Sequence, residues 1–203
     1  MSENSKIWKL ILILWSAWVW KWTLISLLKE RKDPDEYFFP VSCTTREPRL
    51  INETWELEKH WENYFFLKKE EFEEKIKNWE FLEFAHVHWK TYYWILKKPV
   101  LDAINEWKIV IREADVQWFD SINKIFDKEI FWSIFIDMPE IEILKNRIRS
   151  RAAISEDELN ARIKSVEMER KYKEKTDFFI ENIEDWIEEM YEDLLEKIEE
   201  LTK

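Results

Sequence analysis

The chain has 203 residues, which suits one α/β domain with small appendages rather than two large domains. It carries 43 acidic and 32 basic side chains, and the net charge of −11 argues against general binding to nucleic acid or to anionic membrane surfaces. Cys43 is the only cysteine, which excludes an intramolecular disulfide and predicts a cytoplasmic protein whose thiol serves packing.

Glycine is absent from the chain, whereas tryptophan occurs 14 times. Average usage of about 7% would give roughly 14 glycines in a chain of this length. Several tryptophans stand where the sequence predicts turns, namely Trp79, Trp89, Trp94, Trp107 and Trp118. Turns often need positive φ, which glycine adopts readily. We therefore interpret tryptophan as replacing the glycine of a parent sequence, because a protein naturally rich in tryptophan would not explain these positions.

Residues 7–28 form a long apolar run that could be mistaken for a signal anchor. Lys21 lies within this run, where a charge is costly in a bilayer. With glycine in place of its tryptophans, the run divides into a strand, a loop and a helix that are too short to span a membrane. We therefore expect no membrane segment.

The order of the predicted elements is typical of an α/β protein. Residues 9–14 are apolar throughout and predict a central strand buried on both faces, followed by a helix over 23–32 and a strand over 37–41. Residues 69–78 predict an amphipathic helix and residues 81–88 a half-exposed strand, both in a small inserted subdomain.

The second half of the chain returns to the α/β pattern and extends the main sheet. We expect helices over 99–106 and 119–126, and strands over 109–114 and 133–137. Residues 140–175 are heavily charged and helical, and a last strand over 178–180 precedes a helix that begins at residue 185.

The segment between the first strand and the first helix has the pattern of a Walker A loop once glycine replaces each tryptophan. It consists of Trp15, Ser16, Ala17, Trp18, Val19, Trp20, Lys21, Trp22 and Thr23. In such a loop backbone N–H groups surround the phosphates of ATP, the lysine contacts the β and γ phosphates, and the hydroxyl lies near Mg²⁺. Lys21 and Thr23 would supply these two side chains; the alternative is that Lys21 is a solvated charge.

A second phosphate-binding pattern follows the strand over 37–41. Arg46 and Arg49 are three residues apart in a loop that also carries hydroxyl groups. Two arginines in this arrangement can hold a phosphate by charge-assisted hydrogen bonds. For an isolated pair, two solvated loop arginines would be the default interpretation.

These segments resemble the guanylate kinases, a family of P-loop nucleoside monophosphate kinases. The resemblance covers nearly the whole chain and continues through residues 55–56, 61–66, 80–85, 92–94 and 115–118. It implies an α/β P-loop fold in which helices flank a parallel sheet. It also implies a core of residues 1–45, 96–145 and 165–203, a GMP-binding subdomain over 46–95 and a helical lid over 146–164.

The same resemblance implies transfer of the ATP γ-phosphoryl group to GMP, which gives ADP and GDP, with Mg²⁺ as cofactor. The residues that it places at the GMP phosphate are Ser42, Arg46, Arg49, Tyr64 and Tyr93. It places Glu83 and Asp115 at guanine, and a carboxylate is a suitable acceptor for the N1–H and N2–H₂ groups of that base. The alternative for Glu83 is a carboxylate on the exposed face of a strand.

The resemblance implies a catalytic role for Lys21 and for three arginines of the lid and its flanks, Arg147, Arg151 and Arg162. Phosphoryl transfer needs positive charge around the moving phosphate, which such arginines can provide. Charged helices also carry arginines for solubility alone, and Arg149 is interpreted in that way.

Some residues depart from the pattern of the family without involving tryptophan. Ile95 stands where a serine or threonine usually helps to bind guanine, and Arg112 occupies a position that is usually apolar. Ala152 and Ala153 replace a glycine-hydroxyl pair of the lid, and the loop over 49–61 is longer than usual. Selectivity for the base is therefore less well defined than phosphoryl transfer.

The sequence predicts no bound zinc, although His86 and His88 could share one face of a strand. Neither a cysteine nor a third histidine is placed to complete a site. The oligomeric state is not predicted.

Three functions are compatible with the sequence. The first is the kinase, and the second is a non-catalytic module that binds phosphorylated peptides in the acceptor cleft. The third is that the chain as written has no function, because tryptophans in the Walker A loop would block phosphate. Fourteen strained positions at about 1 to 3 kcal/mol each compete with a total stability of about 5 to 15 kcal/mol. We therefore expect the chain as written neither to bind ATP usefully nor to reach the family fold.

Overall fold

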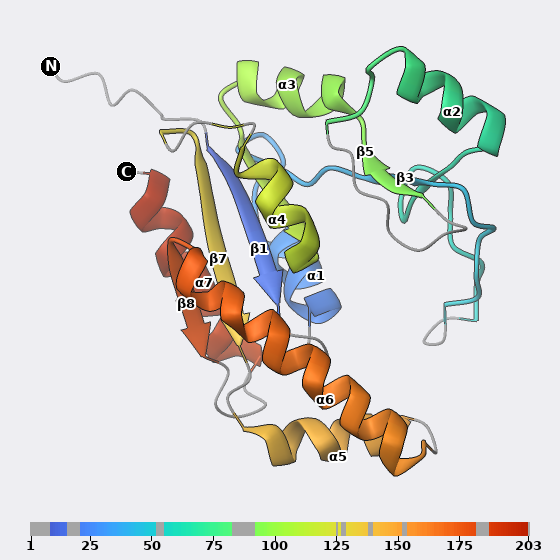
Figure 1. Ribbon diagram of the computed structural model, residues 1–203. Coiled ribbons are helices and arrows are strands. Elements are labelled where there is room, and N and C mark those ends of the chain that lie inside the picture. Colours follow the sequence, from blue (N-terminus) through green and yellow to red (C-terminus); the bar gives the residue numbers. More distant parts are fainter. Residues whose placement is uncertain are drawn as a thin grey trace, which may run out of the picture.

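The computed structural model describes residues 9–15, 21–51, 55–82, 92–124, 126, 129–137, 140–151, 154–181 and 187–202 (Figure 1). The first half contains β1 (Leu10–Trp15), α1 (Lys21–Arg31), β2 (Tyr37–Phe38), β3 (Ser42–Thr44), β4 (Phe65–Phe66), α2 (Lys69–Lys77), β5 (Tyr93–Ile95) and α3 (Lys97–Asn105). The second half contains β6 (Ile109–Ala114), α4 (Val116–Ile122), β7 (Phe131–Asp137), α5 (Ile141–Arg151), α6 (Glu156–Arg170), the 3-10 helix η1 (Lys171–Lys175), β8 (Phe178–Glu181) and α7 (Ile187–Thr202).

The main sheet is parallel throughout, with the strand order β2-β6-β1-β7-β8. The predicted central position of β1 is confirmed, because this strand pairs with β6 on one side and with β7 on the other. All of its residues are buried. The continuous apolar run of β1 therefore reflects burial on both faces of the sheet.

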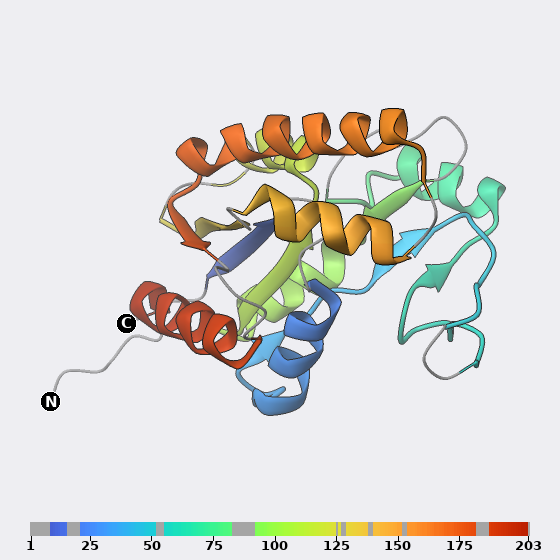
Figure 2. The ribbon, with the colours of Figure 1, turned by 90° about the horizontal axis from the view of Figure 1, so that it is seen from below.

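Two layers of helices enclose the main sheet (Figures 1 and 2). Ile11 and Ile13 of β1 belong to the cluster that also contains the apolar residues of α1 and α7. Leu10 and Leu12 belong to the cluster on the opposite face, which is completed by α3 and α4. Alternate residues of one strand thus anchor opposite helical layers.

A second, three-stranded sheet with the order β4-β3-β5 forms a small subdomain beside the main sheet. Phe72 of α2 is fully buried in it and stacks on Phe81, with ring centroids 4.5 Å apart. Cys43 lies in the same cluster, and burial raises the pKa of its thiol to about 12. This agrees with the predicted packing role. The sequence did not predict β3 and β5, whereas most of the strand expected over 81–88 lies outside the described residues.

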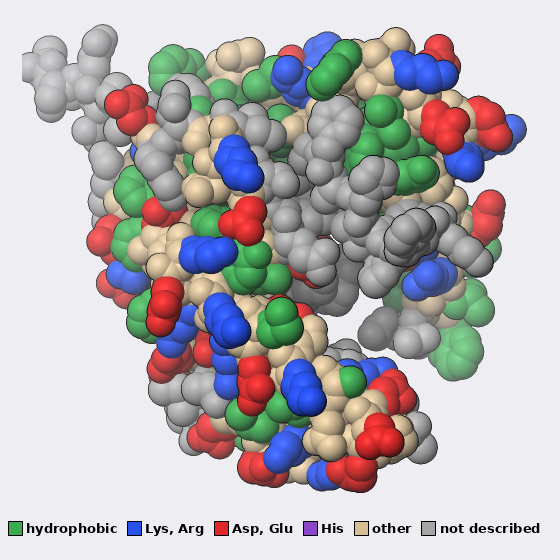
Figure 3. All heavy atoms as spheres, viewed as in Figure 1, with side chains coloured by type: hydrophobic (Ala, Val, Ile, Leu, Met, Phe, Trp, Pro, Cys, Tyr) green, Lys and Arg blue, Asp and Glu red, His purple; other side chains and the backbone are tan. Residues whose placement is uncertain are grey.

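Helices α5 and α6 lie side by side and project from the carboxyl edge of the main sheet (Figures 1 and 2). Leu144 and Ile148 of α5 and Leu159 of α6 are buried in the core cluster of that side. Basic and acidic side chains are interspersed along these helices in the view of Figure 3. Within the described ranges, no helix has the length and apolar character that a membrane crossing requires.

Two helices end in Schellman motifs with tryptophan at the position that usually carries glycine. After α2, Trp79 has φ 58° and donates to the Ile76 carbonyl, while the Glu80 N–H donates to Lys75. After α3, Trp107 has φ 63° in the equivalent position. Since glycine carries no Cβ penalty in this left-handed conformation, both backbones match the residue inferred for the parent sequence.

The structure has the α/β architecture of the family, whereas the expectation that the chain as written is too strained to reach this fold stays a prediction about its stability. Among the described residues, positive φ is confined to four tryptophans, Trp55, Trp61, Trp79 and Trp107. Their exposed fractions range from 58% to 80%, so each indole extends into solvent. The strain at these four positions is therefore limited to the backbone and does not enter the core.

Trp94 and Trp118 do not lie at turns, contrary to the sequence-based prediction. Trp94 is in β5, where it is 2% exposed and packs against Phe72 and Phe81. Trp118 falls within α4. Glycine within a strand can mark a close approach of another backbone instead of a turn. The sequence positions of Trp94 and Trp118 did not distinguish a turn from such a place within an element.

We predict that Trp79→Gly and Trp107→Gly each raise the free energy of unfolding by about 1 kcal/mol, because glycine removes the left-handed backbone penalty. The matched control is Trp94→Gly, which should lower it by about 3–5 kcal/mol by opening a cavity in the small subdomain. Denaturant unfolding measures all three variants. Stability that is unchanged or reduced in both cap variants would contradict the assignment.

Candidate active site

The segment predicted as a phosphate loop follows the carboxyl end of β1 in the sequence. Strand β1 ends at Trp15 and helix α1 begins at Lys21, which are the strand and the helix that flank the loop in a Walker A motif. Ser16, Ala17, Trp18, Val19 and Trp20 lie outside the described residues. Of Lys21 and Trp22 only the backbone is described, and Thr23 is exposed in the first turn of α1.

A cleft of about 100 Å³ lies between the main sheet and the small subdomain. It brings together three of the five residues predicted at the GMP phosphate, Ser42, Tyr64 and Tyr93. Four charged residues that were not predicted as site residues also line it, Lys29, Glu62, Arg112 and Glu113. Side chains from both sheets therefore meet in one concave site.

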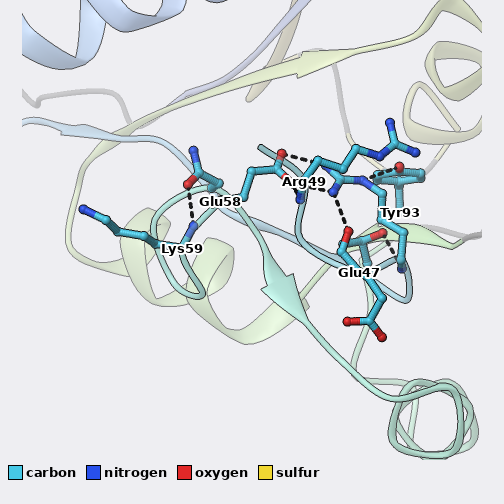
Figure 4. A network of polar contacts seen from close by, with 8 residues as sticks. Glu47, Arg49, Glu58, Lys59 and Tyr93 are labelled. Carbon is cyan, nitrogen blue, oxygen red and sulfur yellow. Dashed lines mark hydrogen bonds and ion pairs between the residues drawn. The ribbon is translucent and has the colours of Figure 1, made fainter. Parts of the chain in front are cut away.

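Arg46 lies beside this cleft and forms a bidentate ion pair with Glu58, which Figure 4 shows near Arg49 and Tyr93. Its Nη1 and Nη2 atoms are 2.5 and 2.7 Å from the two carboxylate oxygens, and the side chains are only 11% and 15% exposed. Glu58 also accepts a hydrogen bond of 2.8 Å from the backbone N–H of Arg49. One carboxylate therefore organises both arginines of the predicted phosphate-binding loop.

Arg46 makes two further hydrogen bonds. Its Nε donates to the hydroxyl of Tyr93 at 2.9 Å, and its Nη1 donates to the Glu47 carbonyl at 2.9 Å. Its guanidinium carbon also lies 4.8 Å from the ring centre of Tyr64. These contacts use most of the five N–H groups of a guanidinium, so Arg46 is held firmly, whereas the side chain of Arg49 is exposed.

The contacts shift the pKa values of the groups around Arg46. The hydrogen bond to Glu58 raises the pKa of Arg46, and the same contact lowers the pKa of Glu58. Burial raises the pKa of the Tyr64 phenol, and the negative charge of Glu113 adds to this rise. The pair thus stays ionised, and Tyr64 keeps its proton as a hydrogen-bond donor.

Ser42 receives a hydrogen bond of its own from the main sheet. Arg112 of β6 donates from Nη2 to the Ser42 hydroxyl oxygen at 3.0 Å. Ser42 is 6% exposed in β3, so the bond joins the two sheets at the floor of the cleft.

Other predicted site residues are not brought into the cleft. Asp115 is exposed between β6 and α4 and does not line it, and Glu83 lies outside the described residues. Arg147 and Arg151 lie on α5, but their side chains are not described. Arg162 of α6 pairs with Glu158 of the same helix at 2.6 Å.

Glu58 and Glu113 were not predicted as site residues, and Arg112 stood out in the sequence only as a departure from the family. Glu58 lies 12 residues from Arg46, and no local pattern indicates their pairing. Glu113 could have been found as a carboxylate at the end of a predicted apolar strand. Within the described part of the chain, no group of three or more His, Cys, Asp or Glu residues could hold a metal ion; His86 and His88 lie outside it.

A parallel sheet, a helix that follows its central strand and a cleft beside both are the arrangement of a P-loop nucleoside monophosphate kinase fold. The family model described as guanylate kinase matches residues 11–201. The guanylate kinase of Clostridium tetani is 36% identical over 87% of this chain and 77% of its own length. The guanylate kinase of Malacoplasma penetrans is 33% identical over 90% of this chain and 89% of its own length. The chain belongs to the guanylate kinase family.

The fold agrees with this relationship. The crystal structure of guanylate kinase from Anaplasma phagocytophilum matches 98% of this chain and 88% of that chain, with a TM-score of 0.72 at 23% identity.

We predict that Glu58→Gln lowers the free energy of unfolding at pH 7 by about 1–3 kcal/mol, because it removes a charge-assisted hydrogen-bonded pair. The pKa of Glu58 is lower in the folded state, so its contribution is fully present above the unfolded value of about 4.3. The contribution is lost as the pH falls through the folded pKa. The difference in free energy of unfolding between the original chain and Glu58→Gln should therefore narrow below about pH 4.

The control is Glu56→Gln in the same loop, because the Glu56 side chain is 65% exposed and lies 3.8 Å from Lys59. Urea unfolding at several pH values should show little effect of this change at any pH. An equal loss of stability in the two variants at pH 7 would contradict the special role of Glu58.

Proposed function

We propose that this protein transfers the γ-phosphoryl group of ATP to GMP, giving ADP and GDP. The observation that carries the proposal is the gathering of Ser42, Tyr64 and Tyr93 in one cleft beside Arg46. This acceptor cleft borders the sheet from whose central strand the P-loop leads into α1. Phosphoryl transfer depends mainly on placing donor and acceptor in line, which this arrangement supports.

In our proposal the acceptor phosphate is held by hydroxyl groups and by the two loop arginines. The Tyr93 hydroxyl accepts from Arg46, so its own proton is left to donate to a phosphate oxygen. Arg49, whose side chain is exposed, would supply a guanidinium fork from the same loop. We assign guanine recognition to Glu83 and Asp115 on the family resemblance and on carboxylate chemistry.

On the donor side, we assign the ATP phosphates to the loop of residues 15–23, with the Lys21 ammonium at the β and γ phosphates. The Thr23 hydroxyl and the Glu113 carboxylate suit Mg²⁺, which prefers oxygen ligands. Glu113 Oε2 is buried and has no hydrogen-bond partner among the described residues. Mg²⁺, when bound, would neutralise charge on the β and γ phosphates.

We propose that Arg147, Arg151 and Arg162 stabilise the charge that develops on the transferred phosphoryl group. All three lie on the hairpin of α5 and α6, the lid proposed over residues 146–164. Arg170 at the end of α6 donates from Nε to the nearly buried Asp137 of β7 at 2.8 Å. This ion pair would anchor the lid to the carboxyl edge of the sheet.

The remaining assignments follow from this role. The core would comprise residues 1–45, 96–145 and 165–203, and residues 46–95 would form the GMP-binding subdomain. We propose ATP and GMP as the substrates, no nucleic-acid or membrane partner, and a location in the cytoplasm. The net charge of −11 and the mixture of signs along α5 and α6 support the absence of a nucleic-acid partner.

A second candidate function is a module that binds phosphorylated peptides without catalysis. It is favoured by one observation: Ser42, Tyr64 and Tyr93, which would hold the phosphate, belong to segments other than residues 15–23. A cleft of this kind can hold a phosphate whether or not ATP binds.

We predict that the chain as written forms no measurable ADP from ATP and GMP, because indoles at Trp15, Trp18, Trp20 and Trp22 obstruct the phosphates. Replacing these four tryptophans with glycine should restore GMP-dependent formation of ADP in a coupled assay. Lys21→Ala in the restored chain is the control and should abolish the reaction. If the restored chain binds phosphopeptide but neither ATP nor GMP, the module is the correct function.

We also predict that Arg162→Ala in the glycine-restored chain lowers kcat by at least about tenfold, because the transition state loses a positive charge. The KM for GMP should change little. The control is Arg149→Ala, since Arg149 is exposed and pairs with Glu156 on the lid surface. Steady-state kinetics that show equal effects of the two changes would contradict the assignment of Arg162.

A further inference from the structure

Arg112 is a charged residue in an interior strand of the main sheet. It lies in β6, between β2 and β1, and is in register with the fully buried Leu12. Its neighbours Val110 and Ile111 are buried core residues. A guanidinium in such a place is costly unless hydrogen bonds compensate for the loss of water.

The hydrogen bond from Arg112 determines what the Ser42 hydroxyl can do. A hydroxyl has one proton to donate and two lone pairs that can accept. Because Arg112 can only donate, the Ser42 oxygen must be the acceptor in this 3.0 Å contact. The Ser42 proton is then left for another acceptor, and Ser42 lines the cleft in which the acceptor phosphate is proposed to bind.

Arg112 also contributes positive charge to the same cleft. It lines the cleft with Lys29, Glu62 and Glu113. Its charge acts on Tyr64, where it opposes the rise in the pKa of the phenol. The Arg112 guanidinium therefore acts on at least two of the hydroxyl groups proposed to contact phosphate, those of Ser42 and Tyr64.

We propose that Arg112 is a positioning residue for the acceptor phosphate, which turns Ser42 into a hydrogen-bond donor and brings a fixed positive charge beneath the phosphate. This inference rests on the proposed binding of GMP. It differs from the assignment made on the family resemblance, in which this position is usually apolar and has no role. The pair of Arg112 and Ser42 repeats the relation between Arg46 and Tyr93, where an arginine also donates to a cleft hydroxyl.

The test is calorimetric titration of the full chain with GMP and, separately, with guanosine. We expect Arg112→Leu to weaken GMP binding by about tenfold, the scale of one charge-assisted hydrogen bond. Guanosine lacks the phosphate, so its affinity should change by less than about twofold if the role is confined to phosphate binding. Arg149→Leu removes the same charge from the exposed surface of α5 and should leave both affinities within about twofold.

A double-mutant cycle with Ser42→Ala identifies the route of the effect. If Arg112 acts through Ser42, the double variant should bind GMP only about two- to threefold more weakly than whichever single variant has the lower affinity. Fully multiplicative losses would show that Arg112 does not act through Ser42. Arg112→Gln keeps a donor near Ser42 without the charge, so its affinity for GMP should lie between those of the original chain and of Arg112→Leu. This variant replaces Arg112→Leu in the test if the leucine variant does not fold.

Two further outcomes would overturn the inference. Unchanged GMP affinity in Arg112→Leu would remove any role at the phosphate, and equal losses for GMP and guanosine would indicate a merely structural role. Both are distinguishable from failure of the proposed function, in which the unsubstituted chain itself would not bind GMP in the same titration.

Discussion

The site depends on the parallel pairing of β1 with β6 on one side and with β7 on the other. Because the three strands run in the same direction, their carboxyl ends meet at one edge of the sheet. Trp15 ends β1 there, Glu113 lies near the end of β6, and Asp137 ends β7. The end of β1, the cleft and the ion pair between Arg170 and Asp137 are thus positioned by one buried core, and the phosphate loop, acceptor site and lid that we propose would share this support.

The acceptor side is held in place by its own polar contacts. Arg46 is fixed by Glu58 and the hydroxyl of Tyr93, and Arg112 is bonded to Ser42. In both cases a guanidinium donates to a hydroxyl, which leaves the hydroxyl proton to face an incoming oxygen. Groups fixed before a ligand binds lose less conformational entropy on binding, which supports the phosphate site that we propose for this cleft.

The sequence predicted the elements that local patterns determine. The strand β6 matches the predicted range, and β1 has the predicted central position because its apolar run shows burial on both faces. β3 and β5 were missed since each has only three residues and exists through pairing between positions about 50 residues apart. Glu58 was missed for the same reason, because only the folded loop brings it to Arg46.

Tryptophan at positions of positive φ has different consequences for the fold and for catalysis. At the turns after α2 and α3, the backbone faces solvent, and the indoles of Trp79 and Trp107 extend away from the core. A phosphate loop differs because its glycines face the ligand, and a side chain there occupies the volume that the phosphate needs. We therefore propose that replacement of glycine by tryptophan is tolerated at exposed turns and prevents nucleotide binding at the loop, so that one kind of substitution would affect the fold and the activity separately.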